Sequence, residues 1–224
     1  MTSSDESDAQ TRVVPRVRVV DDEESIQTLF QTLGAVGGFE VVSYRTVTEF
    51  LQRAEDDRPG CLVLDLRLPD GTGIDVLEAM AKKNDPLPVV CMSGRACVSQ
   101  AVAALKLGSL DFVEKPFDLQ AMLAAIRSAI DRDVARRALG ADLARLRRNF
   151  ARLSPREVEV MEMIVAGCAN KTVAARLDLS PKTIEVHRSN VMRKTEAKSL
   201  AELVRMHIAI KGASEPANPS TPRP

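Results

Sequence analysis

The sequence predicts an α/β domain followed by a small all-helical domain, and two observations carry this prediction. From Val17 to about Arg127, short aliphatic runs typical of buried parallel strands alternate with amphipathic helical patterns. From residue 153 onward, helix-start signals precede short amphipathic stretches instead. Alternating strands and helices indicate a five-stranded parallel, doubly wound sheet, whereas helices alone indicate a small bundle.

Five aliphatic runs, each ending in polar or turn-forming residues, predict the strands of the sheet. They lie at residues 17–20, 40–43, 61–64, 87–92 and 111–113. Helices are predicted between and after these runs from apolar residues at helical spacing and from capping signals such as Thr46–Glu49. The first helix should stop near Gly34 and Gly37–Gly38, and Asp118 should cap the last.

Four helix starts predict the second domain. They are Ser154-Pro155, Asn170-Lys171, Ser180-Pro181 and Ser199. In the Ser-Pro pairs an N-cap precedes proline at the first helical position, where no backbone donor is needed. The expected boundaries are 15–130 for the sheet domain, 131–152 for a helical linker and 153–211 for the helical domain, with disordered ends at 1–14 and 212–224.

The linker is Arg-rich and carries a short apolar stripe. Its members, at intervals of four, three and four residues, are Leu139, Leu143, Leu146 and Phe150. This spacing resembles a heptad pattern. Two interpretations stay open, because about two heptads are a weak coiled-coil signal. The stripe either packs on its own domain or forms a dimer interface.

The net charge of the chain is zero, but its two halves differ. Residues 1–130 carry 20 acidic and 13 basic side chains, a balance of −7, and residues 131–224 carry 11 and 18, a balance of +7. Nucleic acid is therefore the first candidate partner for the basic half. No apolar run approaches the roughly 20 residues of a membrane helix, and the N-terminus lacks a signal-peptide pattern. A cytoplasmic protein is expected.

The four cysteines form no CxxC pair. Cys61 and Cys91 fall in predicted buried strands, where reduced thiols pack as small apolar side chains. Cys97 and Cys168 are the candidates for the alternative, a redox switch.

Polar side chains follow four of the predicted strands at their carboxyl ends. Asp21 and Asp22 follow the first strand, Asp65 the third, Ser93 the fourth and Lys115 the fifth. Because these ends lie side by side in a parallel sheet, we expect the side chains to converge. A carboxylate can accept a phosphoryl group when a hard cation such as Mg²⁺ and an ammonium neutralise its oxygens. The sequence therefore predicts a phosphate-and-metal site around Asp65.

This segment resembles the receiver domain of two-component response regulators. The matching strings are VVDDEES (19–25), LVLDLRLPDGTGIDVL (62–77), VVCMSG (89–94) and DFVEKPF (111–117). The similarity covers about Arg16 to Ile130 and implies a flavodoxin-like fold with Asp65 as the phosphoacceptor. It also implies that Asp21, Asp22, Asp65 and the backbone carbonyl of Arg67 hold Mg²⁺.

The resemblance implies three further roles. Ser93 occupies the switch-hydroxyl position, Lys115 the phosphate-binding position and Phe112 the aromatic switch position. The peptide before Pro116 is usually cis in this family. Arg67 and Arg95 stand where relatives tune the lifetime of the phosphate, and that lifetime stays open. A haloacid-dehalogenase-type phosphatase would need a second Asp at position 67, where this chain has Arg67.

The third predicted helix of the second domain, Pro181 to about Lys194, presents polar residues on its non-core side. A shorter helix and a tight turn precede it, as in a helix-turn-helix whose later helix enters the major groove. The alternative is a helical bundle with a solvated polar face. The string from Leu153 to Lys194, followed by SLAELVR, resembles the LuxR-type helix-turn-helix. Together with EKPF in the first domain, it resembles the FixJ/NarL class, and its FixJ-like branch in particular.

The LuxR resemblance divides the expected DNA contacts into two groups. Those expected to face bases are Glu185, Val186 and Ser189. Those expected mostly to contact phosphates are Asn170, Lys171, Lys182, Thr183, His187, Arg188 and Lys194. Phosphate contacts set affinity and salt dependence, and base contacts set sequence specificity.

The sequence thus predicts a non-enzymatic transcription factor, with at most slow autodephosphorylation. The expected partners are a sensor histidine kinase, double-stranded promoter DNA, a second copy of the phosphorylated chain and RNA polymerase. Two alternatives stay open: a receiver that acts as a phosphate sink or protein-docking module, and a DNA-binding regulator that works unphosphorylated.

Overall fold

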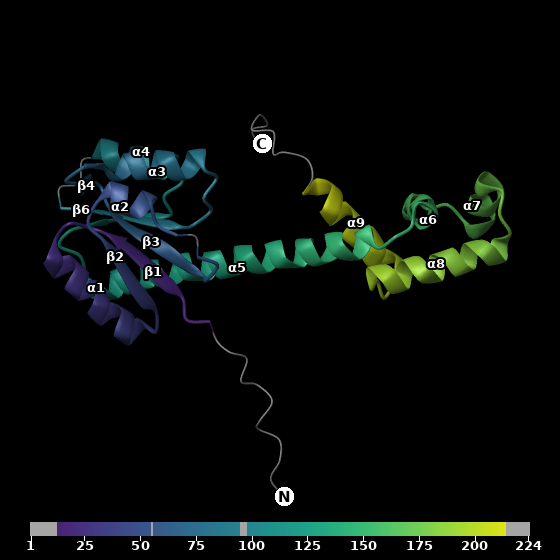
Figure 1. The fold of residues 1–224 in the computed structure, drawn as a ribbon, viewed down its shortest axis with the longest axis horizontal. Coiled ribbons are helices and arrows are strands. Elements are labelled where there is room, and N and C mark those ends of the chain that lie inside the picture. Colours follow the sequence, from purple (N-terminus) through teal and green to yellow (C-terminus); the bar gives the residue numbers. More distant parts are fainter. Residues whose placement is uncertain (1–12, 55, 95–97, 214–224) are drawn as a thin grey trace, which may run out of the picture. The chain divides into compact units, whose positions relative to one another are not determined.

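The computed structural model describes residues 13–54, 56–94 and 98–213, and the chain divides into two compact units, Met1–Arg137 and Ala138–Pro224 (Figure 1). Arg95 and Cys97 lie outside the described residues, as do most residues of the two predicted disordered ends. Among the described residues, no helix is both long and apolar enough to cross a bilayer.

The first unit is built on a five-stranded parallel sheet. Its strands are β1 (Arg16–Val20), β2 (Glu40–Tyr44), β3 (Gly60–Asp65), β6 (Val89–Ser93) and β7 (Asp111–Glu114), in the order β2-β1-β3-β6-β7. This order confirms the predicted doubly wound, flavodoxin-like fold. A separate antiparallel ribbon, β4 (Arg67–Leu68) with β5 (Gly71–Thr72), was not predicted.

Helices cover both faces of the sheet (Figure 1). They are α1 (Glu24–Gly37), α2 (Val47–Leu51), α3 (Gly73–Lys82), α4 (Val98–Lys106) and the first part of α5 (Leu119–Ala151). On one face, Phe30 of α1 and Ile126 of α5 belong to a buried core cluster. On the other, Phe50 of α2 and Leu77 of α3 belong to a second. The central strands β1, β3 and β6 therefore bury both of their faces, as expected of a parallel sheet, while the edge strands β2 and β7 stay partly exposed.

Capping and close packing fix the ends of these helices. Helix α1 ends at Gly37, and Gly38 follows with a positive φ of 75°. Gly34 lies inside the helix, where an added Cβ would approach the Phe39 carbonyl oxygen to 2.8 Å, so only glycine fits this close contact. The Thr46 side chain caps α2, and the Asp118 carboxylate accepts a hydrogen bond from the N–H of Ala121 at 2.9 Å, as predicted.

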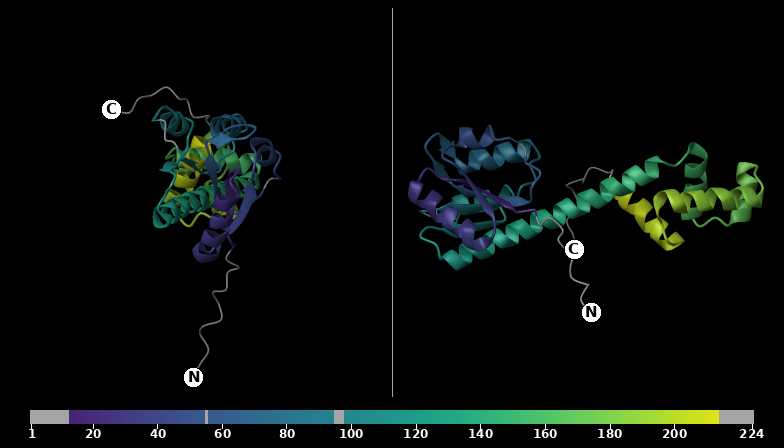
Figure 2. Two further views of the ribbon diagram at one scale, coloured as in Figure 1. Left: turned by 90° about the vertical axis from the view of Figure 1, so that its left-hand side faces the viewer. Right: turned by 60° about the horizontal axis from the view of Figure 1, so that its bottom comes forward.

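The expected final receiver helix and the expected linker helix form one continuous helix, α5 (Figure 2). Gly140 does not interrupt it; glycine costs a helix only about 1 kcal/mol. In the apolar stripe, Phe150 packs against a core cluster of the second unit, while Leu139 is 67% exposed.

Asp133 of α5 is fully buried in the first unit. It accepts hydrogen bonds from the Gly60 N–H at 3.0 Å and from the side chains of Arg136 and Arg137 at 2.5 and 2.7 Å. Burial opposes its ionisation, but the arginine hydrogen bonds outweigh that effect and lower the pKa of Asp133. This cluster joins α5 to the start of β3.

The described part of the second unit contains the end of α5 and four further helices. These are α6 (Pro155–Val165), α7 (Asn170–Leu177), α8 (Pro181–Thr195) and α9 (Leu200–Gly212). Ser154 and Glu157 form a reciprocal capping box, and Ser180 and Ser199 cap α8 and α9. Ile184 and Val191 of α8 are fully buried in the core, which leaves the opposite side of α8 exposed.

The described cysteines agree with the prediction for the strands. Cys61 and Cys91 are free thiols with no exposed surface, and burial raises the pKa of Cys91 to about 11. Cys168 is a free, half-buried thiol.

Candidate functional site

The carboxyl ends of three strands bring Asp21, Asp65 and Lys115 together. Asp21 follows β1, Asp65 ends β3 and Lys115 follows β7. The Lys115 Nζ lies 2.6 Å from Asp21 Oδ2 and 2.6 Å from Asp65 Oδ2. One ammonium therefore bridges two carboxylates that are 44 residues apart in the chain.

Burial makes this arrangement electrostatically strong. Asp21 is fully buried, Asp65 is 6% exposed and the Lys115 side chain is 11% exposed. Burial disfavours a charged lysine, but its hydrogen bonds with Asp21 and Asp65 outweigh that effect and raise the pKa of Lys115. Burial raises the pKa of Asp21 despite its bond from Lys115. Partial neutralisation by one lysine leaves this acidic cluster suited to a further cation.

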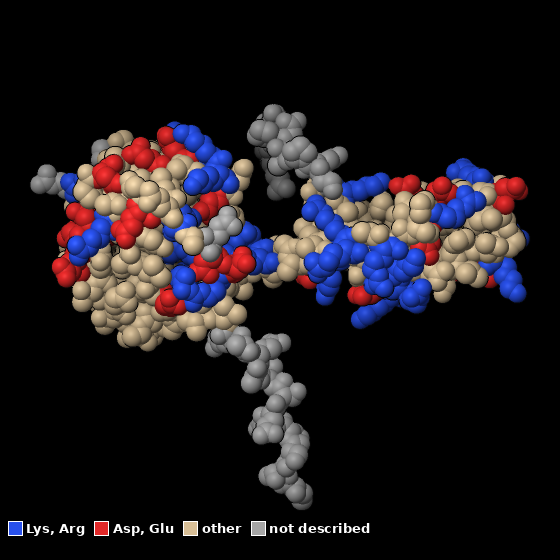
Figure 3. All heavy atoms as spheres, viewed as in Figure 1, with Lys and Arg blue, Asp and Glu red and all other residues tan. Residues whose placement is uncertain are grey.

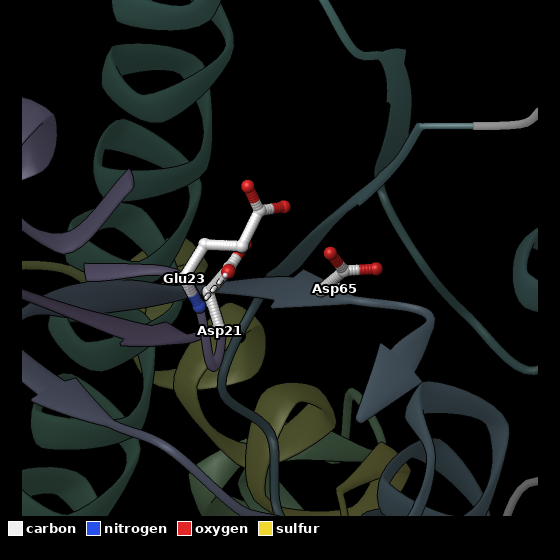
Figure 4. A group of neighbouring side chains, drawn as sticks. All are labelled: Asp21, Glu23 and Asp65. Carbon is white, nitrogen blue, oxygen red and sulfur yellow. Dashed lines mark hydrogen bonds between the residues drawn. The ribbon is translucent and has the colours of Figure 1, made fainter. Parts of the chain in front are cut away.

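Glu23 is a third carboxylate of the cluster, and the sequence argument did not include it. One oxygen each from Asp21, Glu23 and Asp65 lies within 4.8 Å of the others (Figure 4). Glu23 precedes the first turn of α1, where its backbone N–H donates to Asp21 Oδ1 at 2.9 Å and its carboxylate lies 3.2 Å from Lys115 Nζ. Asp22, predicted as a metal ligand, is exposed and not part of this group.

The remaining predicted site residues lie around Asp65. Ser93 is fully buried at the end of β6, and its carbonyl accepts a hydrogen bond from the Lys115 N–H at 2.8 Å. The Arg67 N–H donates to Asp65 Oδ1 at 2.9 Å. Phe112 of β7 is half-buried against the core cluster that contains Phe50. The Lys115–Pro116 peptide is cis, as expected.

Helix α8 of the second unit presents a polar, exposed side. Glu185, Val186 and Ser189, the residues expected to face bases, are all exposed, and Val186 is 56% exposed despite its apolar side chain. Ser180 accepts a hydrogen bond from the Thr183 N–H at 3.0 Å, which fixes the start of α8.

Some of the side chains expected to contact phosphates are exposed, and others are bonded to neighbouring residues. Lys171 and Lys182 are exposed. Arg188 Nη1 donates to Asn170 Oδ1 at 3.1 Å, which joins α8 to the start of α7. Lys194 Nζ lies 2.6 Å from Glu157 Oε2. Lys and Arg side chains gather over the second unit on the face shown in Figure 3.

Family models match both units. Residues 17–127 match the response regulator receiver domain, and residues 151–207 match the bacterial regulatory proteins of the luxR family. The boundaries of these matches lie on either side of the central part of α5.

Curated relatives match nearly the whole chain. It is 41% identical over 193 residues to the transcriptional regulatory protein FixJ of Rhizobium meliloti (strain 1021), which covers 86% of this chain and 95% of the relative. It is 38% identical over 200 residues to nodulation protein W of Bradyrhizobium diazoefficiens, covering 89% of this chain and 87% of the relative.

Solved structures agree with this match. The response regulator StyR has a TM-score of 0.80 at 34% identity and covers 87% of this chain and 98% of its own. Full-length FixJ from B. japonicum has a TM-score of 0.55 at 38% identity, with 88% and 98% covered. The chain therefore belongs to the two-component response regulators of the FixJ-like class, in which a receiver domain is joined to a LuxR-type DNA-binding domain.

Proposed function

We propose that phosphorylation of Asp65 by a sensor histidine kinase switches this transcription factor. The observation that carries the proposal is the Lys115 ammonium, held 2.6 Å from both Asp65 and Asp21 at the carboxyl edge of the sheet. A cation in this position can neutralise a phosphoryl oxygen as the group is transferred.

The transfer exchanges one phosphorus bond for another. An Asp65 carboxylate oxygen attacks the phosphorus of a phosphohistidine, the new O–P bond forms and the N–P bond breaks, which returns the electron pair to the imidazole. Mg²⁺, when bound, would supply charge neutralisation, and Asp21, Asp22, Asp65 and the Arg67 carbonyl would hold it. Clustered carboxylate oxygens suit this hard cation, and Glu23 adds a further oxygen nearby.

Ser93 and Phe112 would carry the change away from Asp65. The buried Ser93 end of β6 is bonded to Lys115, and Phe112 lies on the neighbouring strand β7. The face expected to form a homodimer lies around residues 97–118. On α4 within this range, the apolar residues Val102 and Leu105 are exposed, which supports the proposal. The apolar stripe of α5 is the second candidate for this interface.

Helix α8 would then read promoter DNA in the major groove. Glu185, Val186 and Ser189 would contact bases, while Asn170, Lys171, Lys182, Thr183, His187, Arg188 and Lys194 would mostly contact phosphates. The protein would work in the cytoplasm, recruit or exclude RNA polymerase, and lose its phosphate by slow autodephosphorylation. Arg67, whose N–H contacts Asp65, would affect the rate of that loss.

Substitution of the acceptor tests the proposal. In Asp65→Asn, acyl-phosphate labelling by acetyl phosphate or the kinase should fall to background, and phosphorylation should no longer strengthen dimerisation or DNA binding. Asp131→Asn is the matched control, because Asp131 is an exposed carboxylate on α5. Labelling of Asp65→Asn at the wild-type level would refute the assignment of the site. If the unsubstituted protein is labelled normally but binds no DNA, the alternative of a phosphate sink is favoured.

A further inference from the structure

A pocket of about 440 Å³ opens at the amino edge of the receiver sheet, opposite the acidic cluster. Its walls come from β1, from the end of α2, from the loops that precede β3 and β6, and from α5, all within the first unit. The volume lies in the range of small-molecule sites. Phosphotransfer at Asp65 makes no use of it.

Cationic side chains outnumber anionic ones among the described residues of its lining. The five cations are Arg18, Arg53, Lys83, Arg136 and Arg137. The three anions are Asp56, Asp57 and Asp85. Asp133 lies nearby and accepts hydrogen bonds from Arg136 and Arg137. If it is counted as a fourth anion against the five cations, the described lining still carries one net positive charge.

Some cations of the pocket lining are already bonded, whereas Lys83 is exposed. Arg53 pairs with Asp85. Arg137 Nη1 donates to the Asp57 carbonyl at 2.7 Å. Lys83 is exposed at the C-terminal end of α3. The apolar side chains of Leu51 and Leu87 line the same space. The lining therefore combines cationic donors with apolar walls.

Arg18 is the decisive residue, because its charge is buried and incompletely paired. It is 4% exposed, and its Nη2 lies 3.2 Å from Asp56 Oδ2. Its Nη1 is buried and has no hydrogen-bond partner among the described atoms. Burial lowers the pKa of Arg18 even though Asp56 opposes that shift. An unsatisfied buried donor is costly, so an acceptor placed beside it would be favoured.

We propose that this pocket binds a small organic anion, with its carboxylate or phosphate group on Arg18 and Lys83 and its apolar part against Leu51 and Leu87. The anion would place its negative charge beside the Arg18 guanidinium, which belongs to the pocket lining and pairs with Asp56. Because Arg136 and Arg137 belong to α5, the bound anion would also hold this turn of α5 against the sheet. The site is independent of phosphorylation at Asp65.

Three probes with one aromatic ring test the site in the full chain. Phenyl phosphate and phenylacetate carry the two candidate anionic groups, and benzyl alcohol is the neutral control. Titration calorimetry is done on the Asp65→Asn protein without Mg²⁺, so that the acidic cluster neither accepts a phosphoryl group nor recruits phosphate through a metal. Arginine Nε–H resonances locate the bound probe. We expect saturable binding of at least one anion, and which anion binds more tightly identifies the preferred group.

Substitutions in the pocket lining should change the affinity for the anionic probes in a defined order. Arg18→Met should weaken binding about tenfold, the loss of roughly one charge-assisted contact. In this variant the Asp56 carboxylate still has two ion-pair partners, Arg16 at 2.6 Å and Arg58 at 3.4 Å, so we expect the protein to fold. Lys83→Gln should weaken binding less, and Lys82→Gln, at the neighbouring exposed lysine outside the pocket, should not change it.

A blocking variant keeps the test decisive if Arg18→Met is unstable. Ala54 is exposed at the pocket wall, so Ala54→Trp should fill the space without disturbing the core and abolish binding. The proposal is overturned if neither anion binds saturably or if benzyl alcohol binds as tightly as the anions. It is also overturned if binding survives both Arg18→Met and Ala54→Trp.

Discussion

The acidic site of the first unit and helix α8 of the second unit hold their charged groups in opposite ways. Asp21, Asp65 and Lys115 come from three strands, are largely buried and bond to one another. The residues of α8 that face outward, such as Lys182 and Glu185, belong to one helix and are exposed. The first arrangement depends on the whole sheet, and the second only on how α8 is capped and packed.

This difference determines how each region should respond to substitution. Removing one member of a bonded, buried group changes the pKa values and stability of the others, so the effects are large and not additive. Removing one exposed side chain changes binding to a partner and little else, because surface substitutions rarely alter stability by more than about 0.5 kcal/mol. Substitutions in both regions test this contrast.

The largest effect is expected at Lys115. Lys115→Met leaves the carboxylates of Asp21, Glu23 and Asp65 close together without their shared cation, which should destabilise the protein by about 3 kcal/mol near pH 7. Burial already raises the pKa of Asp21, and loss of the Lys115 hydrogen bond should raise it further. A carboxylate whose pKa is higher in the folded than in the unfolded state destabilises the fold as pH increases. The variant should therefore be closer to the wild type near pH 5 than near pH 7, as measured by urea unfolding.

Lys106→Met is the control for this prediction, because Lys106 is an exposed lysine at the end of α4. Added Mg²⁺ should restore part of the stability lost in Lys115→Met, since it replaces the missing positive charge. A Lys115→Met protein as stable as the wild type at both pH values would show that the cluster is not electrostatically coupled.

The positions of Asp65, Ser93 and Lys115 could be predicted from the sequence, because the order of the strands decides which strand ends are neighbours. Asp65, Ser93 and Lys115 each end or follow a strand of the same sheet, so the topology of the sheet sets their positions. The relative positions of Asp22 and Glu23 depend instead on side-chain directions just before α1, which a run of consecutive acidic residues does not reveal. Glu23 was missed for this reason.

Other features were missed because they arise between segments distant in the chain. The sequence did not reveal that α5 stays packed on the sheet past residue 130. This packing depends on Asp133, which accepts a hydrogen bond from Gly60, 73 residues away. The pocket at Arg18 also depends on loops that meet only in the folded unit. In α8, by contrast, the helical period predicted that Lys182, Glu185 and Ser189 face outward, and all three are exposed, whereas the outward position of Val186 followed only from the LuxR resemblance.

The next largest effect is expected for paired substitutions on α8. Lys182→Gln with Arg188→Gln should weaken binding to random-sequence duplex DNA at least about tenfold and reduce the salt slope by roughly 1.8, because two phosphate contacts are lost. Fluorescence anisotropy across a salt series measures both quantities. The Arg205→Gln and Lys211→Gln pair on α9 removes the same charge from exposed positions and should have a much smaller effect. Equal effects of the two pairs would indicate that net charge, not α8, determines DNA binding.

The smallest effect is expected at Glu157, which among the described residues of the second unit is the one buried charged side chain. Hydrogen bonds from Lys194 and from the Ser154 N–H lower the pKa of Glu157, so its stabilising effect is present at neutral pH and is lost as pH falls through the folded-state pKa. Glu157→Gln should cost about 1 kcal/mol near pH 7.

Hydrogen exchange of α6 and α8 amides measures this loss in the second unit directly, because the exchange of each amide reports the local opening free energy. Glu162→Gln, at an exposed position on the same helix, is the control. Lys194→Gln should reproduce the stability loss of Glu157→Gln and change the salt slope of DNA binding less than Lys182→Gln, because Glu157 already neutralises the Lys194 ammonium. If Lys194→Gln reduces the salt slope as much as Lys182→Gln without loss of stability, Lys194 contacts DNA as freely as the exposed residues of α8.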